Sequence, residues 1–247
     1  MKVWLSLLLI GLTSCVAQQV SPISSESARH VSAKAHAELA SEYLNRKQMA
    51  FALEEFQNAA TIDPTYSPAF SGLGLVYESL QEDAKAEDNF KKAIKLDPES
   101  SESHNNYGSF LCSRNRIDES INQFMLALNN PLYATPAFAY LNAGLCSLKK
   151  PDTRNAEIYL KKALEIQPLL HPAAYYLAKI YLERKQYNYA NEAIQYSMTS
   201  NPDSKTLWLG INIARGLGDK NAESSYALEL KGKYPDSPET QLLLSGK

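Results

Sequence analysis

The sequence predicts an all-α fold in which tandem helical hairpins stack into a right-handed superhelical solenoid. The first observation is the spacing of the prolines: Pro64 and Pro98 are 34 residues apart, and so are Pro168 and Pro202. The second is that small and large apolar residues recur at the same places within each 34-residue window. The third is a composition of 45% hydrophobic and 21% charged residues, which is ordinary for a soluble globular chain.

The recurring residues have the properties that a stacked hairpin needs. Small residues let two helices approach to about 8–10 Å, and large residues fill the space that one hairpin alone cannot enclose. A proline cannot continue a helix, so it ends the second helix before the next unit begins. In the window that ends at Pro98, the signature residues are Leu73, Gly74, Tyr77, Ala86, Phe90 and Ala93. This period and this signature are typical of tetratricopeptide repeats.

The repeats define the organisation of the chain. We predict five of them between residues 33 and 202, at approximately 33–66, 67–100, 101–136, 137–170 and 171–204. A two-residue insertion between Pro131 and Pro136 interrupts the register. Beyond Pro202 the signature weakens, and residues 203–247 are predicted to form a degenerate sixth helix pair that caps the stack, as terminal units commonly do.

The first fourteen residues differ from the rest of the chain. Lys2 precedes an apolar run from Val3 to Leu12, which is too short to cross a bilayer as a helix and has the length of a secretory h-region. A buried N-terminal helix is the alternative, but the run has no polar face at helical spacing. Residues 1–14 are therefore predicted to be a signal peptide. The segment LTSC at 12–15 resembles a bacterial lipobox, and this resemblance implies that Cys15 is lipidated, for example with palmitate.

Lipidation of Cys15 would anchor the mature protein to a membrane, because each buried methylene contributes about 0.8 kcal/mol. The residue after Cys15 is Val16 and not the Asp that resembles an inner-membrane retention signal, so we expect an outer-membrane lipoprotein that faces the periplasm. Residues 15–32 are rich in Ser and Gln and have few large apolar side chains. They are predicted to form the lipidated N-terminus and a flexible tether.

Charge and motif content favour a binding scaffold over an enzyme. The formal net charge of −2 provides no basic field for nucleic acid, so no nucleic-acid partner is expected. The four histidines lack the spacing of a helical metal site, and we expect neither a metal nor a cofactor besides the covalent lipid. No nucleophile-elbow or phosphate-loop motif is present, which lowers the expectation of catalysis.

Two cysteines are left once Cys15 is assigned to the lipid. Cys112 and Cys146 occur late in the first helices of repeats three and four, which are neighbours in the stack. An even number of thiols in an oxidising compartment favours a disulfide between them. The alternative is that both are buried as small hydrophobic side chains.

An apolar stripe runs along the first helices of repeats four and five. Its residues occupy positions that face the concave groove in solenoids of this kind, whereas the signature core positions are filled by other residues. We predict that this stripe binds an apolar segment of a partner protein. The two alternatives are that the stripe belongs to the core, or that the C-terminal cap covers it. The predicted groove residues are Phe138, Leu141, Leu145, Leu148, Tyr175 and Leu182.

Several segments resemble one family more closely than they resemble generic repeats. They are NNYGSFLC at 105–112, NAGLC at 142–146, the stretch from Leu207 to Leu230, and YPDSPET at 234–240. Together with the leader and the lipobox, they are similar to the type IV pilus biogenesis and stability lipoproteins called PilF or PilW. Both Cys112 and Cys146 lie inside these family-like segments, which supports a paired role.

The resemblance implies a pilotin, a lipoprotein that binds type IV pilus secretin subunits and promotes their multimerisation and localisation in the outer membrane. The repeats would recognise the subunit, and the lipid would raise its local concentration at the membrane. We expect the protein itself to be monomeric and not an enzyme. The alternative is a general periplasmic adaptor lipoprotein for cell-wall enzymes or for outer-membrane protein assembly.

Overall fold

The structure, a computed structural model, describes residues 25–151, 153–199 and 201–246, and it is helical throughout these ranges apart from turns and short links. The predicted signal peptide, Cys15 and the first part of the predicted tether lie outside the described residues. The helices are α1 (Ser25–Asn45), α2 (Met49–Ile62), α3 (Ser67–Ser79), α4 (Asp83–Leu96), α5 (Ser101–Ser113), α6 (Ile117–Leu128), α7 (Pro136–Ser147), α8 (Arg154–Ile166), α9 (His171–Glu183), α10 (Tyr187–Thr199), α11 (Ser204–Leu217), α12 (Lys220–Lys233) and α13 (Pro238–Leu244).

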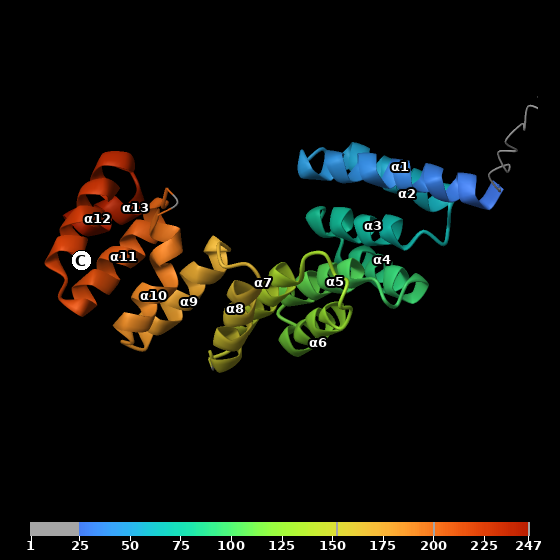
Figure 1. The fold of residues 1–247 in the computed structure, drawn as a ribbon. Helices are drawn as coiled ribbons and strands as arrows, with labels where there is room; N and C mark the ends of the chain where they lie inside the picture. Colours follow the sequence, from blue (N-terminus) through green and yellow to red (C-terminus); the bar gives the residue numbers. More distant parts are fainter. Residues whose placement is uncertain (1–24, 152, 200, 247) are drawn as a thin grey trace, which may run out of the picture.

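Consecutive helices pair as antiparallel hairpins, and the hairpins follow one another in a curved row from α1 to α13 (Figure 1). Each odd-numbered helix from α1 to α11 also contacts the next odd-numbered helix, whereas the even-numbered helices up to α10 contact only their neighbours in the chain. The odd-numbered helices are therefore the more closely spaced layer. Because the inner side of a curved stack is the shorter one, this layer forms the concave face. The predicted all-α repeat solenoid is confirmed.

The signature residues hold each hairpin together in the way that their sizes predict. The ring of Phe90 on α4 lies against Gly74 on α3, where an added Cβ atom would be 2.6 Å from the nearest ring carbon. Phe124 lies against Gly108 at 2.8 Å, and Leu160 against Gly144 at 2.8 Å, by the same measure. The closely packed small residue therefore makes room for the large one.

The turns inside four hairpins share one backbone geometry. Two residues after the first helix ends, Lys47, Gln81, Asn115 and Lys185 each have a φ between 59° and 61°. In the sixth hairpin Gly218 takes a left-handed φ of 74°. This conformation reverses the chain within a few residues and brings the second helix back along the first.

The first helix corrects the predicted tether. Helix α1 begins at Ser25, so residues 25–32, which we assigned to a flexible segment, are helical. The extra turns are attached to the end of α2 and the link after it. His30 Nδ1 lies 3.0 Å from Asp63 Oδ2, and the His30 ring packs edge-on against Tyr66 with centroids 5.0 Å apart. These contacts span more than thirty residues of sequence, so local composition did not indicate them.

The last helices form the predicted sixth pair and an additional cap. Helices α11 and α12 make a hairpin, and the short α13 packs against both. Asp203 caps α11 by accepting a hydrogen bond from the Thr206 amide at 2.8 Å, and Asp219 caps α12. No described helix has the length and apolar character needed to cross a membrane.

Candidate functional site on the inner face

Polar side chains connect the inner helices of repeats two, three and four. Asn106 Nδ2 on α5 donates to Ser71 Oγ on α3 at 3.2 Å. Asn142 Nδ2 on α7 donates to Asn105 Oδ1 on α5 at 3.1 Å. Each bond joins a residue to one about 35 positions away, which is one repeat. Serine and asparagine side chains therefore line this part of the concave layer and also fix the spacing of its helices.

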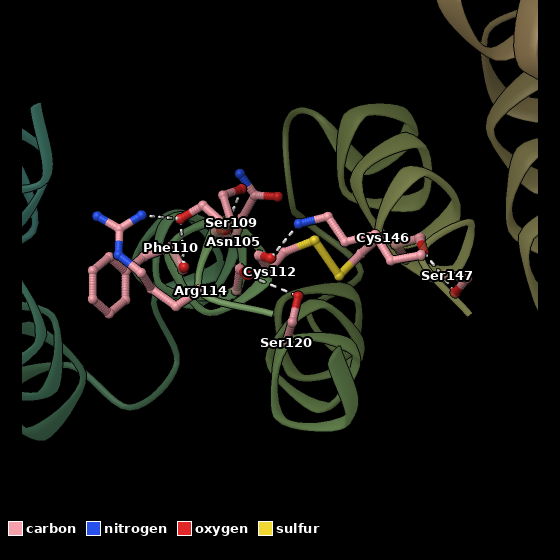
Figure 2. The surroundings of a disulfide bond; sticks show 12 residues. Asn105, Ser109, Phe110, Cys112, Arg114, Ser120, Cys146 and Ser147 are labelled. Carbon is pink, nitrogen blue, oxygen red and sulfur yellow. Dashed lines mark hydrogen bonds between the residues drawn. A yellow bond between two sulfur atoms is a disulfide. The ribbon is translucent and has the colours of Figure 1, made fainter. Parts of the chain in front are cut away.

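A disulfide joins the same layer between repeats three and four. Cys112 on α5 and Cys146 on α7 have an S–S distance of 2.23 Å and a Cα–Cα distance of 5.7 Å (Figure 2). Lys149 Nζ also donates to the Cys112 carbonyl oxygen at 2.5 Å. The structure thus agrees with the paired interpretation of these cysteines, although Cys146 is also fully buried, as the alternative expected.

The predicted apolar groove is only partly open. Leu141 is 6% exposed and belongs to the core cluster that includes Leu160 and Leu177, so its assignment to the groove was wrong. Ala37 and Ser71, at the same position of repeats one and two, are buried as well.

The other groove residues stay at or near the surface. Phe138 is 45% exposed. The remaining four are half-buried and pack against the outside of the core cluster that contains Leu141. They are Leu145, Leu148, Tyr175 and Leu182. Leu145 lines a hollow of about 260 Å³ beside the disulfide, and Tyr175 lines another of about 250 Å³ next to α11. The C-terminal cap therefore does not cover the whole stripe, which offers shallow apolar contacts around Phe138.

A pocket that the sequence did not indicate lies at the other end of the inner face. It has a volume of about 320 Å³ and is bordered by α1, α3 and α5. Gly72 on α3 lies at its wall, and the Phe56 ring beneath Gly72 reaches the pocket. The available signal was a second glycine two residues before the signature Gly74, but only the folded hairpin reveals the space beside it.

Two carboxylates tie helices together on the side away from the groove. Glu87 on α4 accepts hydrogen bonds from Tyr107 at 2.9 Å and Arg116 at 2.8 Å. Partial burial would raise the pKa of Glu87, but the bonds from Lys91, Arg116 and Tyr107 outweigh it and lower the pKa to about 2.

Glu157 on α8 repeats this arrangement two repeats further on. It accepts from Tyr181 at 3.0 Å and from Arg184 at 2.5 Å. Burial again opposes ionisation of Glu157, and the bonds from Lys161, Arg184 and Tyr181 lower its pKa to about 2. These networks fasten one repeat to the next and leave the inner face free for a partner.

The histidines serve structural contacts. His36 lies 2.5 Å from Glu55, and His104 bonds Gln123 at 2.7 Å and the Pro98 carbonyl at 2.9 Å. Among the described residues, no three or more His, Cys, Asp or Glu side chains are grouped so that they could hold a metal ion.

Comparison with known proteins agrees with this architecture. The tetratricopeptide-repeat family models match residues 68–100, 89–122 and 139–168. Stacked hairpins with an exposed concave layer define a tetratricopeptide-repeat protein, a class whose fold serves protein–protein interaction.

Two solved structures and one curated sequence give a narrower relationship. The crystal structure of PilW, described as a widely conserved type IV pilus biogenesis factor, is 34% identical, with a TM-score of 0.75 over 86% of this chain and 98% of that chain. The structure of Pseudomonas aeruginosa PilF is 27% identical, with a TM-score of 0.79 over 89% of this chain and 100% of that chain. The type IV pilus assembly protein PilF of P. aeruginosa is 28% identical in sequence over 95% of this chain and 94% of its own length. The chain belongs to the PilF/PilW family of type IV pilus biogenesis factors.

Proposed function

We propose that this protein is a pilotin, an outer-membrane lipoprotein that binds subunits of the type IV pilus secretin and promotes their multimerisation and outer-membrane localisation. The observation that carries the proposal is the similarity to PilF and PilW over nearly the whole chain, including the helices that follow the five regular repeats.

The mechanism requires binding and no bond cleavage. The inner face offers polar groups along α3 and α5 and apolar contacts around Phe138 and Tyr175. Acyl chains on Cys15 would hold the solenoid at the periplasmic side of the outer membrane. A bound secretin subunit would then be concentrated where the multimer forms, without any new contact between subunits.

Deletion of the gene tests the proposal. We expect heat-resistant secretin multimers and surface pili to be lost, and both to return when the wild-type gene is supplied in trans. Immunoblots of unboiled samples measure the multimers, and electron microscopy measures the pili. Unchanged multimers together with altered cell-wall composition would contradict the pilotin function and favour the adaptor for cell-wall enzymes.

A Cys15→Ala variant tests the anchor separately. We expect it to be released from the outer membrane on fractionation, with fewer multimers or with multimers in the inner membrane. Equal abundance of the variant and the wild type in whole-cell blots is the control. Outer-membrane fractionation of the variant at the wild-type level would exclude Cys15 as the anchor.

The apolar stripe of repeats four and five is proposed to contact the secretin subunit, with Leu141 now left out. Phe138 is the best probe, because it is 45% exposed and is not among the residues packed against the core of its repeat. We expect Phe138→Ser to weaken binding of the purified secretin subunit by about tenfold while the melting temperature is unchanged. Leu141→Ser is the contrasting variant, because it should lower stability.

A further inference from the structure

Gly72 lies at the wall of the pocket between α1, α3 and α5, where its missing side chain leaves room for the Phe56 ring. An added Cβ atom on Gly72 would lie 2.1 Å from the nearest carbon of the Phe56 ring. The corresponding residue in the next three repeats is Asn106, Asn142 or Tyr176, each of which has a side chain in this place. Repeat two has a hollow of about 320 Å³ beside this glycine on the concave face, and the Phe56 ring is part of its lining.

The walls of this pocket combine apolar and acidic groups. Leu44, Phe56 and Leu75 supply carbon surface, whereas Glu38 and Glu102 supply two carboxylates from opposite sides, α1 and α5. No Lys, Arg or His is found among the described residues that line it. Two full negative charges exceed the partial positive charge of roughly one half at the start of α5.

The two carboxylates are free to bind a further cation. Glu38 approaches Lys34 only at 3.8 Å on the exposed surface of α1, where such an i,i+4 pair contributes little. Glu102 is exposed in the first turn of α5. A cationic ligand would therefore not have to displace a strong internal ion pair.

Hydrogen-bonding groups stand beside the pocket. Asn106 donates one Nδ2 proton to Ser71 Oγ, and this bond leaves Asn106 Oδ1 and the Ser71 hydroxyl proton for a ligand. Both residues line the pocket. An acceptor and a donor held at a fixed spacing suit the amide groups of an extended backbone.

We infer that this pocket receives an arginine or lysine side chain from an extended segment of a partner protein. Both side chains combine a long aliphatic stem with a charged head. The stem would lie on Phe56, Leu44 and Leu75, and the head would reach Glu38 and Glu102. The backbone of the same segment would bond Ser71 and Asn106. The inference rests on the proposed function only for the identity of the partner, a secretin subunit.

Blocked arginine, N-acetyl-arginine N-methylamide, is the first probe, and its citrulline counterpart is the control because citrulline is neutral and of nearly the same shape. Both are titrated into the full mature chain in detergent micelles and followed by NMR. We expect arginine to shift the backbone signals of Ser71, Gly72 and Asn106 in a saturable way, with citrulline binding about fivefold more weakly. Equal effects of the two probes, or no shift at these residues, would overturn the inference.

Variants of the chain give the matched test. Glu38→Gln with Glu102→Gln should weaken arginine binding about five- to tenfold, since the variant loses two solvent-exposed ion pairs with the ligand, which are individually weak. Glu54→Gln removes an exposed carboxylate from α2, outside the pocket, and should change nothing. Equal melting temperatures of the three proteins show that the comparison concerns binding. Unaltered arginine affinity in the double variant would overturn the inference.

The purified secretin subunit then separates this inference from the proposed function. Weaker binding of the subunit to the double variant supports both. If the subunit binds the wild type and the double variant equally, the pocket is not its cationic receptor, although the pilotin function stands. If the subunit does not bind the wild type but arginine does bind, the pocket stands and the pilotin function falls.

Discussion

At the residue scale, the contact between a small residue and a large one decides how closely two helices pack. The sequence was sufficient to predict these pairs, because the repeat signature places Gly74, Gly108 and Gly144 at one position and a large side chain sixteen residues later. It was not sufficient to predict Gly72, which belongs to no signature. Its role depends on where the Phe56 ring lies in the folded hairpin.

Gly74→Ala should destabilise the protein. The added Cβ atom would lie 2.6 to 2.8 Å from three carbons of the fully buried Phe90 ring, so the ring or the helix must shift. Overpacking of this kind costs about 1–3 kcal/mol, which exceeds the gain of up to about 1 kcal/mol in helix propensity. Urea denaturation measures the difference.

Gly232→Ala is the matched control for Gly74→Ala. Gly232 lies in α12, and an added Cβ atom there meets nothing within 4 Å. Helix propensity should therefore raise the stability of this variant by up to about 1 kcal/mol. Equal effects of the two substitutions would contradict the account of the Gly74–Phe90 contact.

At the scale of the element, periodicity predicted the helices well and their ends less well. The hairpins of the five repeats follow from signature residues that recur every 34 positions, apart from the two-residue insertion before repeat four. The first two turns of α1 escaped prediction because their residues are polar and largely exposed, so they have no amphipathic pattern. The contacts of His30 with Asp63 and Tyr66, which accompany these turns, join segments far apart in the chain.

Leu141 illustrates a different error, because a residue that was predicted to line the groove is buried in the core. Its spacing from Phe138 and Leu145 is that of a helical stripe, and the same spacing fits both a groove and a core. The seven-residue link from 129 to 135 between α6 and α7 also made the register uncertain. Only the packing of α7 against its neighbours distinguishes a groove residue from a core residue, and this packing places Leu141 in the core.

Two carboxylate networks between elements should make stability depend on acid pH. The pKa of Glu87 and that of Glu157 are both lowered to about 2 in the folded protein, compared with an ordinary value near 4.5. As the pH falls, the two carboxylates are therefore protonated in the unfolded chain before they are protonated in the folded protein. The stabilisation is complete above about pH 4.5 and is lost progressively towards pH 2.

The double variant with Glu87→Gln and Glu157→Gln should lose this dependence of stability on acid pH. At pH 7 the double variant should be less stable by about 1–3 kcal/mol, and the difference from the wild type should shrink as the pH approaches 2. Urea denaturation between pH 7 and pH 2 measures it. Glu165→Gln, which changes an exposed carboxylate on α8, is the control. Parallel stability curves for wild type and double variant would contradict the assignment.

At the scale of the whole molecule, the disulfide joins the two halves of the solenoid at the junction that carries the longer link. The bridge closes a loop with a sequence separation of 34 residues, and a loop of this length is expected to restrict the unfolded chain by about 3–4 kcal/mol. The order and number of repeats were predictable from sequence. The bridge was one of two open interpretations, because spacing alone does not fix how close two thiols come.

Replacement of both cysteines, Cys112→Ala with Cys146→Ala, should therefore lower the free energy of unfolding by about 2–4 kcal/mol. Wild-type protein treated with reductant should fall towards the same value. Mass spectrometry of the unreduced protein should give a mass lower by two hydrogen atoms than that of the reduced protein. Two freely alkylated thiols in the unreduced wild type would show that no bridge forms.

The bridge also has a mechanical consequence. A pulling force applied at one end of an unbridged solenoid could unfold and extend every repeat in turn, since each hairpin contacts mainly its neighbours. With Cys112 joined to Cys146, the segment between them, a sequence separation of 34, cannot be extended, which shortens the fully extended chain by about 110 Å. Under a pulling force, the protein would therefore unfold and extend outside this segment. Repeats three and four would stay connected until the disulfide is reduced.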